Sequence, residues 1–246
     1  MNPIKQGAVI LVGGGDTPGE VPQTLLRLAG GAKARIVILA HTQADVGRGA
    51  QRSAAFFKEQ GAENLAAPDT LNPDALAELL SEAQGVWIPG GDQNRFMARL
   101  GGSSAFLSAM RGVLTRGGVV GGTSAGASLM GALMPTGDQS PDGDLRVGAC
   151  QLAPALNLLP NVIVDQHFLK RQRLSRLLCA VLENPHLTGV GVDEGAWAIV
   201  QGDMLRVQRG QVMVIRARTK PHRHENLLGA RSLQLQVLLP QDMTRL

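Results

Sequence analysis

Several residue types and patterns are scarce in this chain. Tyrosine is absent, and only five Phe and two Trp occur among 246 residues. No run of 18 apolar residues exists, so we expect no membrane-spanning segment. The apolar stretch within the first 15 residues is too short for a signal peptide and is interpreted as a first strand. These absences predict a cytoplasmic protein without a membrane partner.

Cysteine is also scarce, with Cys150 and Cys179 alone. Two cysteines give neither the spacing of a metal site nor a disulfide framework, which agrees with a reducing compartment. We therefore expect no metal and no cofactor.

The net charge of +4 is unevenly distributed, because residues 205–246 hold eight Lys or Arg and only two acids. A basic tail can favour nucleic acid. However, its arginines alternate with apolar residues, as in "RVQRGQVMVIRAR", and no aromatic residues that could stack on bases lie between them. The pattern favours the solvated face of strands, and no nucleic-acid partner is predicted.

The order of elements predicts the fold class. Expected strands are residues 8–12, 35–40, 85–88, 118–121, 162–164, 189–192, 196–200, 204–207, 211–216 and 233–239. Expected helices are residues 22–29, 49–60, 73–83, 94–100, 104–116, 125–133 and 168–182. This alternation predicts an α/β fold with a parallel sheet covered by helices on both faces, followed by C-terminal antiparallel strands with turns at 201–203 and 209–210. Residues 135–160 are the one long irregular stretch, and no composition break divides the single domain 1–246.

One serine lies at the apex of a glycine-rich turn in "RGGVVGGTSAGASLMG". Ser124 is central in the pattern Gly122-x-Ser124-x-Gly126, between a predicted strand and a predicted helix. This is the context of a nucleophile elbow, and the N–H of Ala125 at the helix start would stabilise an oxyanion. By itself the pattern agrees equally well with a glycine-rich turn in which Ser124 caps the helix.

A nucleophilic serine needs a base and an orienting acid. The apolar strand in "NVIVDQHF" delivers Asp165, Gln166 and His167 to the carboxyl edge of a parallel sheet, which makes His167 the first choice among five histidines. In "GVGVDEGAWAIV", Asp193 and Glu194 follow another strand, and one of them is expected to accept the imidazole N–H. A plain turn explains these two acids equally well.

The order of these residues discriminates between folds. An α/β-hydrolase has the order serine, acid, histidine, whereas here the acid follows the histidine. An acid between Asp138 and Asp144 would restore the hydrolase order, but that loop is rich in Gly and Pro and poorly suited to hold a carboxylate.

A second glycine-rich turn occurs in "GVWIPGGDQNRFMARL", where a strand runs into Gly90 and Gly91. Glycines at a strand end free backbone N–H groups for a ligand, so the N–H of Gly91 or Asp92 is predicted to be a second oxyanion donor. Gln93 would then face the substrate. The segment has no G-x-G-x-x-G, and the early "VGGGDTPGE" lacks the lysine of a phosphate-binding loop.

The segments "GGDQ", "GTSAGAS", "DQHFLKRQRLSRL" and "GVDEGAWAIV", in this order and spacing, resemble the cyanophycinase family of serine peptidases, which also contains the aspartyl dipeptidase called dipeptidase E. The resemblance extends from the first strand to about Val200. "GTSAGAS" and the arginine-rich segment favour the cyanophycinase branch. The resemblance implies a three-layer sandwich similar to the class I glutamine amidotransferase fold, and it suggests a homodimer.

The resemblance also implies roles for individual residues. It implies that Ser124 is the nucleophile, His167 the base and Glu194 the orienting acid. The residues implied to line the substrate site are Gln93, Asp165, Arg171, Arg173 and Arg176. If a helix follows His167, Arg171 lies one turn away and can bind a substrate carboxylate, whereas Arg173 fits a solvated helix face better. Asp165 could take a substrate guanidinium or amine.

We therefore expect a serine peptidase that hydrolyses amide or isopeptide bonds of aspartyl residues, in cyanophycin-like or other aspartyl peptides. The nearest alternative is an α-aspartyl dipeptidase. A ligand-binding protein of the same fold without catalysis is a further alternative, and it predicts that Ser124 and His167 lie beyond hydrogen-bond reach. An esterase of the α/β-hydrolase type is more distant, because it needs an acid before His167.

Overall fold

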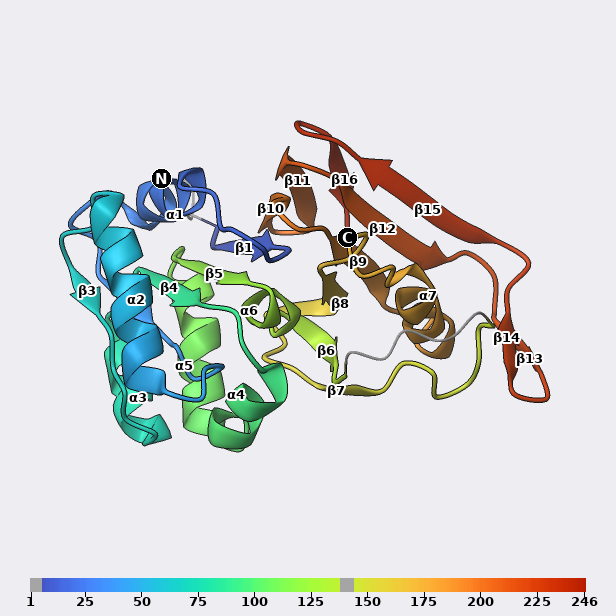
Figure 1. Cartoon of the computed structure of the whole chain (residues 1–246), viewed down its shortest axis with the longest axis horizontal. Coiled ribbons are helices and arrows are strands. Elements are labelled where there is room, and N and C mark those ends of the chain that lie inside the picture. Colours follow the sequence, from blue (N-terminus) through green and yellow to red (C-terminus); the bar gives the residue numbers. More distant parts are fainter. Residues whose placement is uncertain (1–5, 138–143) are drawn as a thin grey trace.

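The computed structural model describes residues 6–137 and 144–246. The first half of the chain builds a parallel sheet (Figure 1). Its strands lie in the order β1 (Ala8–Val12), β5 (Val119–Thr123), β4 (Gly85–Ile88), β2 (Ile36–Ile38) and β3 (Leu65–Ala66). On the other side of β1 the sheet continues with three antiparallel strands, β10 (Trp197–Gln201), β11 (Met204–Arg209) and β16 (Met243–Arg245).

Helices cover both faces of this sheet. On one face, Ala8, Ile10 and Val12 of β1 share a core with α1 (Glu20–Ala29) and α2 (Val46–Glu59). On the other face, Val9 and Leu11 share a core with α3 (Pro73–Ser81), α4 (Gln93–Leu100) and α5 (Ser104–Thr115). Burial on both sides explains why β1 is the unbroken apolar run AVILV rather than an alternating one.

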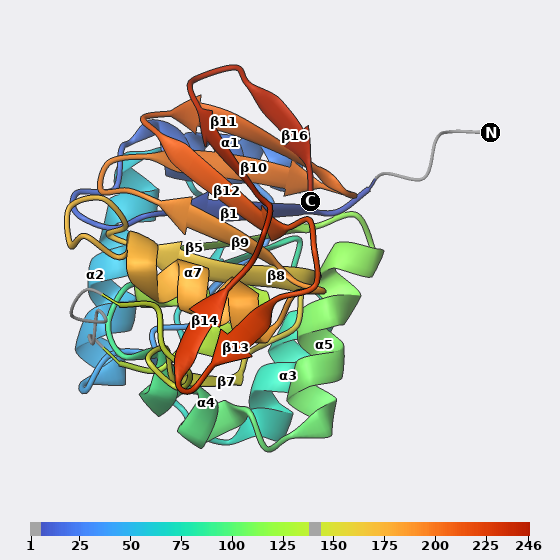
Figure 2. The same ribbon diagram turned by 90° about the vertical axis from the view of Figure 1, so that its right-hand side faces the viewer.

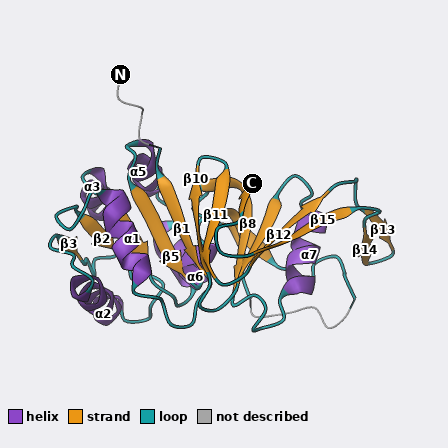
Figure 3. Cartoon of the chain, turned by 90° about the horizontal axis from the view of Figure 1, so that it is seen from above, coloured by secondary structure: helices purple, strands orange, loops and turns teal. Residues whose placement is uncertain are grey.

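A second sheet carries the later strands, in the order β15 (Leu233–Leu238), β12 (Val212–Ala217), β9 (Thr188–Val192), β8 (Leu159–Gln166), β6 (Gly131–Pro135) and β7 (Leu152–Pro154). Strands β6, β8 and β9 are parallel, and the outer strands are antiparallel. Helix α7 (Leu174–Glu183) packs on this sheet, and the hairpin of β13 (His222–His224) and β14 (Leu227–Gly229) lies against α7 (Figure 2). Seen from above, the strands form a band with helices on both sides (Figure 3).

This architecture confirms the α/β class with a parallel sheet and additional antiparallel strands. The turn at 201–203 joins β10 and β11 as predicted, with Gly202 at a φ of 59°. In β11 the exposed Arg206 lies between the buried Leu205 and Val207, so this strand has the solvated face that was predicted for the basic tail. No helix within residues 6–137 and 144–246 is long and apolar enough to cross a membrane.

Four predictions about elements are wrong. The helix expected over 125–133 ends early, as α6 (Ala125–Ser128), and β6 follows it. The helix expected over 168–182 begins only at Leu174, after a series of turns. The turn at 209–210 does not close a hairpin, because β11 and β12 belong to different sheets. Finally, the stretch 135–160 contains β7, although residues 138–143, which include much of the alternative acidic loop, lie outside the described residues.

Candidate active site

Ser124 lies in a strained turn between β5 and α6. Its backbone has φ 53° and ψ −118°, and its N–H donates to the carbonyl of Val12 at 2.9 Å. The flanking glycines are required by close packing. A Cβ on Gly122 would lie 2.5 Å from the carbonyl of Gly126, and a Cβ on Gly126 would collide with the backbone of Ile88. The G-x-S-x-G pattern therefore reflects a turn that presents its serine at a positive φ.

The side chains of Ser124, His167 and Glu194 form one hydrogen-bonded chain. His167 follows β8, and its Nε2 lies 2.9 Å from Oγ of Ser124. The other ring nitrogen, Nδ1, lies 2.6 Å from Oε1 of Glu194, which follows β9. The Ser124 hydroxyl also lies 3.4 Å from Oε1 of Gln166, but its single proton goes to the nearer acceptor, the imidazole. Sequence reasoning anticipated that these three strand ends meet.

Two glycines after β1 hold the imidazole in place. The carbonyl of Gly13 accepts the backbone N–H of His167 at 2.7 Å, and the carbonyl of Gly14 accepts the backbone N–H of Gly195 at 3.0 Å. A Cβ on Gly14 would lie 2.5 Å from Nε2 of His167, so only glycine lets the ring occupy this position. Sequence reasoning missed this role, because it tested "VGGGDTPGE" only as a phosphate-binding loop. The triple glycine directly after a buried strand was the signal.

Burial lowers the pKa of His167 below its ordinary value of 6.5. The hydrogen bond with the Glu194 carboxylate raises the pKa but does not fully offset this effect. The nearby cations of Arg171 and Arg173 lower the pKa further. The His167 side chain is 10% exposed, whereas the Glu194 side chain is 33% exposed. Near neutral pH the ring is consequently neutral and able to accept the serine proton.

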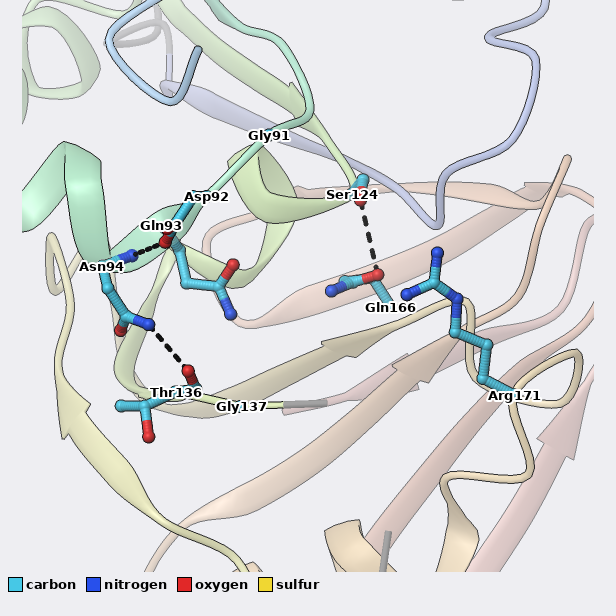
Figure 4. Close-up of a pocket in the computed structure, with 9 residues that line it drawn as sticks. All are labelled: Gly91, Asp92, Gln93, Asn94, Ser124, Thr136, Gly137, Gln166 and Arg171. Atoms are coloured by element: carbon cyan, nitrogen blue, oxygen red, sulfur yellow. Dashed lines mark hydrogen bonds between the residues drawn. The ribbon is translucent and has the colours of Figure 1, made fainter. Parts of the chain in front are cut away.

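Ser124 is one of the residues that line a polar cleft of about 300 Å³ (Figure 4). Arg171 and Gln166 line one side, and the start of α4 lines the other. The amide of Gln93 donates to the carbonyl of Pro135 at 2.7 Å, and that of Asn94 to the carbonyl of Thr136 at 2.7 Å. The predicted cleft residues Gln93 and Arg171 thus do lie around the serine. Asn94 and Thr136 were not predicted, because no motif in the sequence marks them as cleft residues.

The backbone offers two free donors beside the serine. Within the described residues, the N–H groups of Gly91 and Ala125 have no acceptor. By contrast, the N–H of Asp92 donates to the carbonyl of Thr42 at 3.0 Å, and its carboxylate caps α4. The prediction of Asp92 as an oxyanion donor is therefore corrected, since its amide proton is already used.

Asp165, Arg173 and Arg176 lie behind the wall of the cleft instead of on it. Their exposed fractions are 0%, 1% and 2%. Arg176 donates two hydrogen bonds to the Asp165 carboxylate, from Nη2 and from Nε, the latter at 2.9 Å. Arg173 donates to the carbonyl of Gln166 at 2.9 Å. The prediction that these three side chains face the substrate, and that Arg173 is solvated, is corrected. No helix is present at 171–173 to turn Arg173 outwards.

Residues 9–208 match the family model of peptidase family S51. The chain belongs to peptidase family S51. It is 32% identical over 235 residues to a cyanophycinase of Trichormus variabilis, covering 91% of this chain and 78% of the relative. It is 31% identical to a cyanophycinase of Geminocystis herdmanii, covering 80% and 75%. Both relatives agree with the resemblance noted in the sequence.

Two solved structures share the fold of this chain. A peptidase from an acI-B1 actinobacterium superposes with a TM-score of 0.69 at 19% identity, over 98% of this chain and 97% of that one. A putative peptidase E protein of Listeria monocytogenes gives a TM-score of 0.56 at 13% identity, over 83% and 99%. The chain is a serine-type peptidase of the cyanophycinase and dipeptidase E kind. Among the described residues of this S51 peptidase, no three His, Cys, Asp or Glu side chains converge as a metal site would require.

Proposed function

We propose that this S51 peptidase hydrolyses amide or isopeptide bonds formed by aspartyl carboxyl groups, with Ser124, His167 and Glu194 as its catalytic triad. The observation that carries the proposal is the unbroken chain from Oγ of Ser124 through the imidazole to the Glu194 carboxylate, with contacts of 2.9 and 2.6 Å. A ligand-binding protein without catalysis has no need of this geometry.

The proposed reaction proceeds in two halves. Oγ of Ser124 attacks the scissile carbonyl carbon while Nε2 of His167 takes its proton, and Glu194 stabilises the imidazolium through Nδ1–H. The N–H groups of Gly91 and Ala125 bind the oxyanion. His167 then protonates the leaving amine as the C–N bond breaks. A water, deprotonated by His167, attacks the acyl-enzyme, which restores the free serine and releases the acid.

Charge in the cleft supports an acidic acyl group. Arg171 lies on the cleft wall beside Gln166, and a guanidinium binds a carboxylate with two parallel hydrogen bonds. The cyanophycinase relatives agree with such a substrate. We propose that the aspartyl carboxylate not engaged in the scissile bond lies against Arg171.

The test compares hydrolysis of β-Asp-Arg-containing peptides with hydrolysis of α-aspartyl peptides such as Asp-Leu, for wild type and Ser124→Ala. We expect cleavage of the β-linked series by wild type and a loss of at least about 10³-fold in kcat for the variant. Preference for Asp-Leu would instead identify an α-aspartyl dipeptidase that uses the same triad. Full activity of Ser124→Ala on both series would overturn the mechanism.

A further inference from the structure

Thr42 lies in the loop after β2, is fully buried, and contacts the glycine turn that follows β4. Its Oγ1 lies 3.0 Å from the carbonyl oxygens of both Pro89 and Gly90, so its one hydroxyl proton is shared between two acceptors. The carbonyl of Thr42 accepts the backbone N–H of Asp92 at 3.0 Å. One buried residue therefore forms hydrogen bonds to the peptide groups on both sides of Gly91.

These hydrogen bonds fix the direction of the Gly91 N–H. No cis peptide bond occurs among the described residues, and the C=O and N–H of a trans peptide point in opposite directions. Because the Gly90 carbonyl points to Thr42, the N–H of Gly91 in the same peptide points away from Thr42. A Cβ on Gly90 would lie 3.3 Å from Cβ of Ser124, and Gly91 and Ser124 line the same cleft (Figure 4). The N–H of Gly91 is thus directed to the cleft, beside the serine.

Two further features hold this peptide against Thr42. Gly91 has a φ of 146°, and a Cβ on it would lie 2.5 Å from the carbonyl oxygen of Thr42, so only glycine permits so close an approach. The side-chain amide of Gln43 also donates to the Gly90 carbonyl. The carbonyl of the Gly90–Gly91 peptide is consequently held by two side-chain donors from adjacent positions of one loop.

The loop that carries Thr42 is itself anchored by α4. Nη1 of Arg99 donates to the carbonyls of His41 and Gln43, at 2.9 and 2.7 Å. Nη2 of the same guanidinium donates to the carbonyl of Ala44 at 3.3 Å. A shift of the loop would break these hydrogen bonds, so the Thr42 hydroxyl is presented from a fixed backbone.

We propose that Thr42 is a positioning residue of the active site, which holds the Gly90–Gly91 peptide so that the Gly91 N–H binds the oxyanion. The inference rests on the proposed function and adds a buried residue that is not part of the cleft wall. The N–H gains its strongest hydrogen bond only when the substrate carbonyl becomes an oxyanion. Loss of the Thr42 hydroxyl should therefore lower kcat and leave KM nearly unchanged.

Three variants test this role. Thr42→Val keeps the shape of the side chain and removes the hydroxyl, and we expect kcat to fall roughly 10- to 100-fold, less than the 10²–10³-fold loss of a whole oxyanion donor, because Gln43 remains. Thr42→Ser keeps the hydroxyl and should keep most of the activity. The control is Thr188→Val, which removes the hydroxyl of another buried threonine, at the start of β9, and should keep the wild-type kcat.

A pair of substrates separates positioning from a general loss of structure. An aspartyl ester and its thionoester share the acyl and leaving groups and differ only in a carbonyl oxygen or sulfur. Sulfur is the weaker hydrogen-bond acceptor, so a well-placed N–H favours the oxygen ester in the transition state. The measured quantity is the ratio of the two kcat/KM values, in which a smaller folded fraction cancels. Thr42→Val should lower this ratio about tenfold, and Thr42→Ser and Thr188→Val should keep it.

A further variant removes the other donor to the same carbonyl. Gln43→Met should also lower the oxygen-to-sulfur ratio, because Thr42 then holds the Gly90 carbonyl alone. The double variant should lose more than the product of the two single losses, since either donor partly replaces the other. If Thr42→Val does not fold, the ratio of Gln43→Met decides.

The outcomes separate the positioning role from the proposed function. If Thr42→Val and Gln43→Met keep the wild-type ratio while Ser124→Ala is inactive, Thr42 does not direct the Gly91 N–H, and the proposed function stands. An equal fall of the ratio in Thr188→Val would likewise overturn the assignment, because any buried hydroxyl would then have the same effect. If wild type forms no acyl-enzyme from the ester, the proposed function falls and the role of Thr42 falls with it.

Discussion

At the scale of single residues, the site depends on backbone positions that ordinary side chains do not tolerate. Ser124 and His167 both have positive φ, 53° and 49°, although neither is glycine. Such conformations cost of order 1–3 kcal/mol each and persist where the surroundings enforce them. Here the enforcing contacts are the backbone hydrogen bonds to Val12 and Gly13 at the end of β1. Strain is thus located at the proposed nucleophile and base.

Gly14→Ala should disable the site while leaving the fold intact. The added Cβ would overlap the imidazole of His167, and moving a general base by about 1 Å costs about 10²-fold in rate. Steady-state kinetics should show a fall in kcat of that size. Gly31→Ala is a matched control, because Gly31 has nearly the same φ, 108° against 106°, and no atom within 4 Å of the new Cβ. Equal activity of the two variants would show that Gly14 does not position the ring.

The pH profile should report the lowered pKa of His167. Protonated imidazole cannot act as the base, so kcat/KM should fall as the pH decreases. This acidic limb of the profile should lie below pH 6.5. The cation of Arg171 disfavours the imidazolium, so Arg171→Gln should raise the His167 pKa and move this limb to higher pH. Arg171→Lys keeps the charge and should keep the limb. A limb that stays in place or moves to lower pH in Arg171→Gln would contradict this electrostatic account.

At the scale of elements, the segment between β8 and α7 shows what periodicity cannot reveal. Residues 168–182 have a helical apolar pattern, yet 168–173 form turns, and Gln172 has a φ of 52°. The hydrogen bonds of Arg173 and Arg176 to the end of β8 override local propensity there. Likewise, 125–133 is a short apolar run rich in small residues, which does not distinguish a buried helix from a helix turn followed by a buried strand.

Arg176→Leu should destabilise the fold rather than merely weaken substrate binding. The substitution leaves the fully buried Asp165 carboxylate without its main partner, and breaking a buried pair costs about 3–5 kcal/mol. Urea unfolding should show this loss in the free energy of unfolding. Arg171→Leu removes an exposed side chain of the cleft and should cost about 1 kcal/mol or less. Similar stabilities of the two variants would return Arg176 to the list of substrate contacts.

At the scale of the whole molecule, the site is assembled where the two sheets meet. Ser124 follows a strand of the first sheet, and His167 and Glu194 follow strands of the second. The sequence indicated that the carboxyl ends of these strands converge, because parallel strands place their ends at one edge. It did not indicate that the strands divide between two sheets, since the apolar runs of β5, β8 and β9 carry no mark of their partners. The contact of Gly14 with the imidazole, by contrast, had a signal in the sequence, the triple glycine directly after β1.

The most direct measurement of the central claim is the mass of the protein during turnover. Wild type and Ser124→Ala are mixed with an activated aspartyl ester, quenched in acid within the first turnovers, and analysed by intact mass and peptide mapping. We predict that wild type gains one aspartyl acyl group on the peptide that contains Ser124, and that Ser124→Ala gains none and does not turn over. Hydrolysis by Ser124→Ala at the wild-type rate, with no acyl group on that peptide in wild type, would contradict the account.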